Sequence, residues 1–308
     1  MTDDYHTPVL VHEVLQYLSV VPDGVYVDAT LGGGGHAEQI LKALSPRGKL
    51  IGFDMDADAL NHAETRLREF ADRLVCVHGN FADLRQHLIE RGFDRIQGIL
   101  LDLGVSSHQI DTRDRGFSFQ SDGRLDMRMN TAQRLDAWKV LNQYDERQIA
   151  EILWKFGEER NSRRIAKKIV MMRTAEPIQT TTQLALAVES VVGQRWLKKS
   201  LARIFQAIRI EVNDELDNLR HVLRDAIDIL EHGGRIVVVS YHSLEDRIVK
   251  QFFRENSQQH VHRGEKPLSP LAAQLAILTK KPVQAAQAEL VFNRRARSAK
   301  LRAAERIQ

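Results

Sequence analysis

Three aspartates stand where a parallel sheet would bring carboxylates together. Asp28, Asp54 and Asp102 each follow directly on a short apolar run of the kind that forms buried strands. The carboxyl ends of parallel strands meet at one edge of a sheet, which is where such folds bind ligands. Carboxylates at that edge can accept hydrogen bonds from hydroxyls, attract an ammonium group or take up a proton. The spacing therefore predicts a ligand site with three acidic side chains.

Four consecutive glycines, residues 32–35, separate the first two of these strands and open onto a helix-like stretch at 37–44. Without Cβ atoms the backbone can adopt positive φ and come close to a ligand. The pattern G-x-G-x-x-A ends at Ala37, and Asp54 follows Gly35 by 19 residues. Nucleotide-binding sheets place a carboxylate for a ribose diol at about that distance, so the loop predicts a ligand that carries an adenosine.

Two adenosine ligands fit this turn, and a tight turn that binds nothing is the third possibility. NAD would place its pyrophosphate on the N-terminus of the following helix. S-adenosylmethionine lacks a phosphate but ends in an ammonium and a carboxylate. Asp28 favours S-adenosylmethionine, because a carboxylate repels a pyrophosphate and attracts an ammonium. The segment 78–81, His-Gly-Asn-Phe, offers an aromatic and polar corner for an adenine.

Alternating strands and helices up to Asp102 predict a doubly wound α/β sheet. The expected elements are a helix at 11–18, then strands at 25–27, 50–53, 74–77 and 99–101 with helices at 37–44 and 58–70 between them. After Asp102 the alternation gives way to short amphipathic helices and then resumes. The later elements are one long helix at 205–230, a strand at 235–240, a helix at 244–253 and antiparallel strands near 275–279 and 298–304. We expect a helical domain, 111–204, inserted between two parts of an α/β domain, 1–110 and 205–308.

The predicted insert carries the positive charge. Residues 111–203 hold 18 Lys/Arg and 12 Asp/Glu, a formal +6, whereas the rest of the chain is −3. Six cations within fourteen residues would repel one another unless an anion lay near. They are Arg160, Arg163, Arg164, Lys167, Lys168 and Arg173. We expect them to contact phosphates of a nucleic acid rather than to form only a solvated face. Of the three tryptophans, all in the insert, Trp138 and Trp154 are expected to anchor its core.

The composition is that of a globular protein of a reducing compartment. With 308 residues, 43% hydrophobic and 28% charged, the chain can bury a large core. The single cysteine, Cys76, falls inside the third strand, where packing is expected rather than thiol chemistry. No apolar run approaches membrane-spanning length, and the acidic first residues are unlike a signal peptide. We expect a cytoplasmic protein without membrane association.

Longer motifs link these features to a known family. They lie at 101–107 (LDLGVSS), 115–119 (RGFSF), 122–129 (DGRLDMRM), 157–160 (GEER), 205–216 (FQAIRIEVNDEL) and 240–247 (SYHSLEDR). From His6 to Ser298 the chain resembles the bacterial ribosomal RNA small-subunit methyltransferase H family, also called MraW. The resemblance implies a class I methyltransferase with an inserted helical domain, using S-adenosylmethionine and no metal. It further implies N4-methylation of one cytidine in the decoding region of 16S rRNA, in the small ribosomal subunit and not in DNA.

The resemblance also implies where the methyl donor binds. The matching positions are Gly34, Gly35, His36, Asp54, Phe81, Asp102 and Gln109. One departure is local: His108 stands where the family often has proline, which would loosen that loop without moving the contact at Gln109.

The motifs do not spell out catalysis. Many amino-directed DNA methyltransferases grip the amine with an Asp/Asn/Ser-Pro-Pro-Tyr/Phe loop after the fourth strand, which here reads Asp-Leu-Gly-Val. Asp102 is the first candidate to accept the amine proton, and His242, after the fifth strand, is the second. A structural hydrogen bond is the alternative for His242, and Ser243 is expected to cap the following helix. Cys76 inside a strand excludes the thiol attack used for carbon-5 methylation.

Two other functions stay open from the residues alone. An NAD-dependent oxidoreductase would retain nicotinamide instead of the methyl donor. An RNA-binding module without catalysis would show basic surfaces but would have no need for Asp28, Asp54 and Asp102 together.

Overall fold

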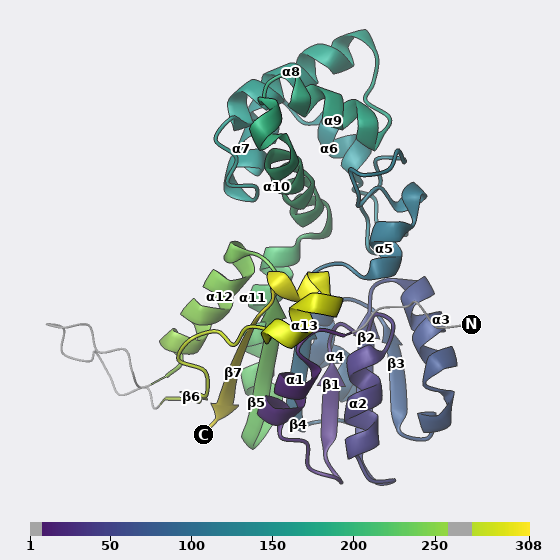
Figure 1. Cartoon of the computed structure of the whole chain (residues 1–308). Coiled ribbons are helices and arrows are strands. Elements are labelled where there is room, and N and C mark those ends of the chain that lie inside the picture. The colour runs from purple at the N-terminus through teal and green to yellow at the C-terminus, as the bar shows by residue number, and fades with distance from the viewer. Residues whose placement is uncertain (1–7, 258–272) are drawn as a thin grey trace, which may run out of the picture. The chain divides into compact units, whose positions relative to one another are not determined.

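The computed structural model describes residues 8–257 and 273–308, so that His6, where the resemblance begins, lies outside the described residues. The chain divides into two compact units. An α/β unit comprises Met1–Gly104 and Leu216–Gln308, and a helical unit comprises Val105–Glu215 (Figure 1). Among the described helices, none has both the length and the apolar character that a membrane span requires.

The α/β unit is built on a seven-stranded sheet in the order β3-β2-β1-β4-β5-β7-β6. The strands are β1 Val25–Asp28, β2 Lys49–Asp54, β3 Leu74–His78, β4 Ile96–Asp102, β5 Leu230–Ser240, β6 Leu275–Ile277 and β7 Lys300–Arg306. Strands β1 to β5 are parallel, and β7 runs antiparallel to both of its neighbours. This topology confirms the expected fold class, a Rossmann-like doubly wound α/β sheet.

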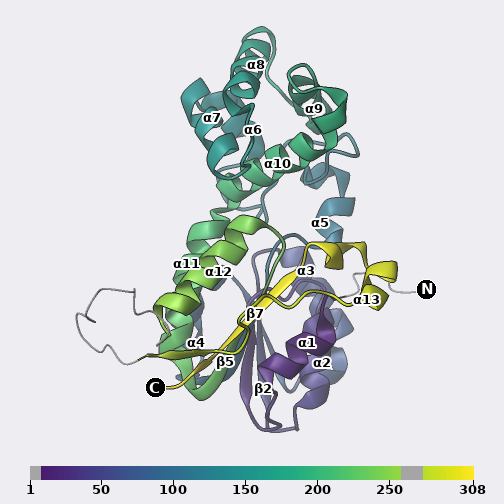
Figure 2. The same ribbon diagram turned by 60° about the vertical axis from the view of Figure 1, so that its left-hand side comes forward.

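Helices cover both faces of the sheet (Figure 2). On one face lie α1 Val11–Leu18, α2 Gly35–Ala43 and α3 Ala57–Arg66, and on the other α4 Leu84–Glu90, α11 Glu215–Ile229 and α12 Ser243–Glu255. Because successive strand residues point to opposite faces, Ile99 and Leu101 of β4 enter one core and Leu100 enters the other. A short helix near the C-terminus, α13, spans Gln287–Phe292.

The helical unit has its own hydrophobic core. Its helices are α5 Ser107–Asp111, α6 Ala137–Gln143, α7 Glu146–Lys155, α8 Ser162–Ala175, α9 Thr181–Glu189 and α10 Gln194–Asn213. Leu125 and Met127 of the loop before α6, and Val212 near the end of α10, are buried in this core. The unit, Val105–Glu215, extends beyond the expected 111–204 on both sides, because α5 begins at Ser107 and Val212 is still part of this core.

The prediction of one long helix over 205–230 is wrong. The chain leaves α10 at Asp214, which has φ 50° in the left-handed region, and α11 starts at the next residue. The Asn213 side chain donates to the carbonyl of Met127 (2.8 Å) and accepts from the amide of Met129 (2.8 Å). These bonds fix the turn to a distant loop, and Asn and Asp tolerate such a turn better than most residues.

The prediction that Trp154 anchors the helical core is also wrong. Its side chain is 61% exposed, whereas Trp138 is partly buried against the core as expected. On α7 the buried positions are Ile149, Ile152 and Leu153. The next residue in a helix is rotated by about 100°, so Trp154 points away from that buried stripe.

Candidate functional site

The turn after β1 is tied to the strands on either side of it. The amide of Ala29 donates to the carbonyl of Leu100 on β4 (2.9 Å), and the amide of Leu31 donates to the carbonyl of Phe53 on β2 (2.8 Å). The Thr30 hydroxyl accepts from the amide of Asp102 (2.7 Å). These bonds hold the glycine turn and the ends of three neighbouring strands in one rigid edge.

The glycine turn keeps the backbone open at this edge. Gly34, the N-cap of α2, has φ 77°, and a Cβ there would lie 3.0 Å from the Leu67 side chain. Gly32 has φ 50°, and a Cβ there would meet nothing closer than 3.8 Å. Gly35 begins α2 against Pro8. No side chain caps the helix start, so the residues present fit a ligand that approaches the backbone closely.

Asp54 lies at the end of β2, where it accepts two backbone hydrogen bonds. Its Oδ2 accepts from the amide of Gly32 (2.8 Å) and its Oδ1 from the amide of Asp56 (2.8 Å). Burial nevertheless raises the pKa of Asp54 to about 6. The amide of Gly79 donates to the Asp54 carbonyl (3.0 Å), which brings the start of the 3₁₀ turn Phe81–Asp83 to the same edge. A carboxylate and an aromatic ring, both predicted from sequence, are thus positioned by adjoining strands.

Asp28 and His36 form the inner part of the edge. Asp28 is 1% exposed, and burial raises its pKa to about 6, with the charges of Asp102 and Asp54 adding to the effect. His36 Nε2 lies 3.5 Å from Asp102 Oδ2. Burial lowers the pKa of His36, but the adjacent Asp102 carboxylate, with the charge of Asp28, outweighs it, so the net shift is upward. Sequence reasoning placed all three residues here without foreseeing that His36 would face Asp102.

Tyr241 is a member of the site that sequence reasoning left without a role. Its hydroxyl donates to Asp102 Oδ1 (2.8 Å). Burial and the neighbouring Asp102 charge hold the pKa of Tyr241 well above its ordinary value, so the phenol keeps its proton. The available signal was its place just beyond β5, because Asp102 and Val239 are paired in the sheet. Asp102 therefore accepts a hydrogen bond from a phenol at Oδ1 and faces an imidazole at Oδ2.

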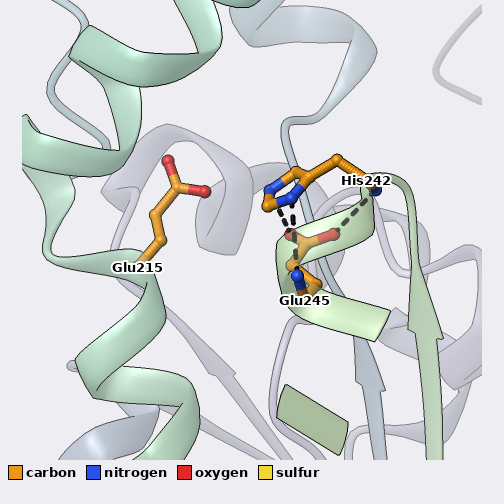
Figure 3. Close-up of side chains that lie close together, drawn as sticks. All are labelled: Glu215, His242 and Glu245. Atoms are coloured by element: carbon orange, nitrogen blue, oxygen red, sulfur yellow. Dashed lines mark hydrogen bonds and ion pairs between the residues drawn. The ribbon is translucent and has the colours of Figure 1, made fainter. Parts of the chain in front are cut away.

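His242 takes a structural position at the start of α12 (Figure 3). Its Nδ1 accepts from the amide of Glu245 (3.5 Å), and its Nε2 lies 3.2 Å from Glu245 Oε1. Glu245 Oε2 accepts from the amides of Tyr241 (2.8 Å) and His242 (3.2 Å). The expectation that Ser243 caps this helix is wrong, because His242 is the N-cap and Ser243 already lies in the first turn.

Gln109 belongs to the helical unit. Its side-chain Oε1 accepts from the backbone amide of Ser106 (3.1 Å), and the backbone amide of Gln109 donates to the Ser106 hydroxyl (3.2 Å). This reciprocal pair caps α5, and Gln109 is 5% exposed. Within its unit Gln109 therefore stabilises a helix start, a role that the family pattern did not specify.

The basic cluster of the helical unit separates into three parts. Arg160, Arg163 and Arg164 line a groove of about 590 Å³ together with residues of α7. Lys167 and Lys168 lie further along α8 and do not line it. Arg173 donates to the carbonyl of Leu141 (2.6 Å) in the last turn of α6, which is a structural bond.

Comparison with known proteins finds one family whose members are similar in sequence over the whole chain. The family model described as the MraW methylase family matches residues 3–307. A "Ribosomal RNA small subunit methyltransferase H" of Chloroherpeton thalassium is 49% identical over all of both chains. A protein of the same name from Carboxydothermus hydrogenoformans is 46% identical, covering 98% of each chain. A solved rRNA methylase from Streptococcus thermophilus matches 98% of this chain and 99% of its own at 13% identity, with a TM-score of 0.45.

Proposed function

The chain belongs to the MraW methylase family, and on that premise we propose that it methylates N4 of a cytidine in the decoding region of 16S rRNA, using S-adenosylmethionine. The observation that carries the proposal is the joining of Asp28, Asp54 and Asp102 with an open glycine turn at one sheet edge. The names of the curated relatives support small-subunit rRNA as the acceptor.

Each residue of the edge has a distinct part in holding the donor. A carboxylate offers about four lone-pair sites, of which backbone amides use two on Asp54, so both oxygens can still accept from ribose hydroxyls. Phe81 offers a ring for the adenine, and the backbone at Gly34 and Gly35 lets the donor approach. Asp28 is too buried to touch it and acts through its charge, which favours an ammonium.

Asp102 is the group best placed to take up the amine proton. An exocyclic amine has its lone pair delocalised into the ring, so an acceptor must orient it and receive its proton. When bound, the donor supplies a sulfonium methyl group as the electrophile. The Tyr241 hydroxyl donates to Oδ1 of Asp102, and His36 faces Oδ2, so the carboxylate has a fixed position. From that position it can orient the amine for in-line attack on the methyl group of the donor. His242 is the second candidate, because Glu245 already engages its ring.

A covalent enzyme intermediate is not part of the proposed mechanism. Carbon-5 methylation of a pyrimidine starts with attack by a thiolate. Cys76 lies in β3, and burial, together with Glu64, raises its thiol pKa to about 12. A neutral thiol inside a strand cannot serve as that nucleophile, so carbon-5 methylation through Cys76 is excluded and the proposed transfer to N4 is direct.

The test is to map the modified nucleoside. Small-subunit rRNA and intact small subunits, both lacking the modification, are incubated with the protein and donor carrying a deuterated methyl group. Mass spectrometry of the digested RNA should find the label on one N4-methylcytidine in the decoding region. A label on carbon 5, on another nucleoside or on no nucleoside overturns the proposal.

We further propose that α8 contacts RNA phosphates. Replacing Arg163, Arg164, Lys167 and Lys168 with glutamine should flatten the slope of log affinity against log salt by about 0.7–0.9 per lost contact, because each neutralised phosphate releases counterions. Binding is measured by anisotropy of a labelled rRNA fragment between about 50 and 300 mM salt, over which the Debye length falls from about 14 Å to about 6 Å.

The control variant removes the same charge elsewhere. Arg47, Arg85, Arg220 and Arg224 are exposed residues of the α/β unit, and their replacement with glutamine should leave the slope close to that of the unmodified protein. If the α8 variant keeps its slope, the phosphate contacts lie instead at another basic segment, of which 294–297 is the first candidate.

A further inference from the structure

One face of α7 presents an aromatic side chain to solvent between charged residues. Arg147, Ala150, Glu151 and Trp154 recur at the spacing that puts residues on one side of a helix. Arg147, Glu151 and Trp154 are exposed. Trp154 is among the most exposed large hydrophobic side chains of the described chain. The exposed indole of Trp154 therefore offers an apolar aromatic surface between charged side chains.

The start of α8 completes a groove beside this face. Arg160, Ser162, Arg163 and Arg164 line it together with the α7 residues, and its volume is about 590 Å³. Four arginines therefore meet a single carboxylate, that of Glu151. Among the described residues, none of these four arginines forms an ion pair within the protein. With one carboxylate among four arginines, the groove keeps an excess of positive charge that is available to an external anion.

A second exposed tryptophan, Trp196, differs from Trp154 in whether cations cover its ring. Trp196 is 52% exposed, but Arg195 and Lys199 lie over its ring, at 5.2 and 5.5 Å from the ring centre. Its face is thus occupied by cations of its own helix. In the described part of the chain no such cation covers Trp154. Trp196 therefore provides a matched control for Trp154.

The chemistry of the groove fits one kind of ligand. An open indole face stacks on a planar ring, and guanidinium groups bind phosphates in a bidentate manner. A free phosphate would not contact the indole, and an apolar segment would lie against four arginines and one glutamate. A nucleotide of single-stranded RNA offers both the ring and the charges, whereas bases paired in a duplex are not open to stacking.

We propose that this groove binds an unpaired nucleotide of the acceptor RNA, with its base stacked on Trp154 and the flanking phosphates bound by Arg147, Arg160, Arg163 and Arg164. The inference rests on the proposed function for the identity of the RNA. The groove shares no residue with the sheet edge that carries Asp28, Asp54 and Asp102, so we expect it to contribute to RNA binding and not to the methyl-transfer step.

The first test measures RNA binding without the methyl donor. The full chain is titrated against a labelled unstructured RNA dodecamer and against the same sequence in a duplex. Trp154→Ala should weaken single-strand binding by about 5- to 150-fold, the fold-change that base–aromatic stacking of ~1–3 kcal/mol corresponds to. Trp154→Phe should restore most of the affinity, and Trp196→Ala should leave it unchanged. Glu151→Gln should strengthen binding, because it removes the one carboxylate of the groove.

The second test observes Trp154 directly. In a Trp138→Phe, Trp196→Phe protein, Trp154 is the only indole, and a stacking base should quench its fluorescence in step with the binding curve. Equal affinity of the Trp154→Ala and unmodified proteins for the single strand overturns the proposal. So does a preference for an acidic peptide over RNA, since that would assign the groove to a protein partner.

The two proposals can fail separately. If the single-strand effect of Trp154→Ala is present but no methyl group reaches small-subunit rRNA, the groove stands and the proposed function fails. If N4-methylation proceeds and Trp154→Ala changes neither binding nor the KM for RNA, the proposed function stands and the groove fails.

Discussion

Replacing Asp102 with asparagine should lower the rate of methyl transfer by at least about a hundredfold, the usual contribution of a positioned proton acceptor. Asparagine keeps the size of the side chain and can still accept from the Tyr241 hydroxyl, but it cannot take up a proton. The measurement is single-turnover kinetics with saturating donor, which separates the chemical step from donor binding.

The partners of Asp102 provide the controls for this variant. Tyr241→Phe removes the hydrogen bond to Oδ1 and leaves the carboxylate in place, so its rate should fall less than that of Asp102→Asn. His242→Gln tests the second candidate, whose ring faces Glu245. If Asp102→Asn keeps its rate and loses only donor affinity, Asp102 is a donor ligand. Catalysis then passes to His242 or to positioning alone.

Replacing Asp54 with alanine should weaken donor binding by about 2–3 kcal/mol, roughly 30- to 150-fold, because a carboxylate that accepts two hydroxyls is lost. Asp54 lies at the end of β2, where it also accepts hydrogen bonds from the backbone amides of Gly32 and Asp56. Asp54→Asn keeps the shape of the side chain and one acceptor oxygen, so it should lose less donor affinity than Asp54→Ala. Calorimetric titration with S-adenosylmethionine measures both variants. An unchanged affinity of Asp54→Ala would remove Asp54 from the donor site.

The pKa of Asp54 makes the same interaction dependent on pH. In the free protein its pKa is raised to about 6, so a large part of it is protonated at pH 5. The ionised form is the better acceptor, so donor binding lowers this pKa and releases a proton near pH 6. Affinity should therefore rise between pH 5 and 7 and then level off. Asp54→Asn should reduce this rise and leave the part due to Asp28, whose pKa is also about 6.

Local pattern was enough to predict the sheet edge at which Asp28, Asp54 and Asp102 lie. An apolar run that ends in an aspartate predicts both the strand and the side chain at its end, and parallel pairing then brings the ends of β1, β2 and β4 together. The four glycines likewise predict their own turn, because only residues without a Cβ combine positive φ with close approach. In both cases residues near in sequence determine the geometry, so Asp54 and the turn could be placed from the sequence.

Contacts between distant segments decided what local pattern could not. Asn213 bonds to the Met127–Met129 loop and ends a helix whose periodicity continues through the break. Tyr241 meets Asp102 because β5 pairs with β4, although 139 residues separate them. The exposure of Trp154 depends on which stripe of α7 is buried, and its groove depends on how α7 and α8 pack. Composition and periodicity describe each segment alone, whereas side-chain burial and partner choice are properties of the packed core.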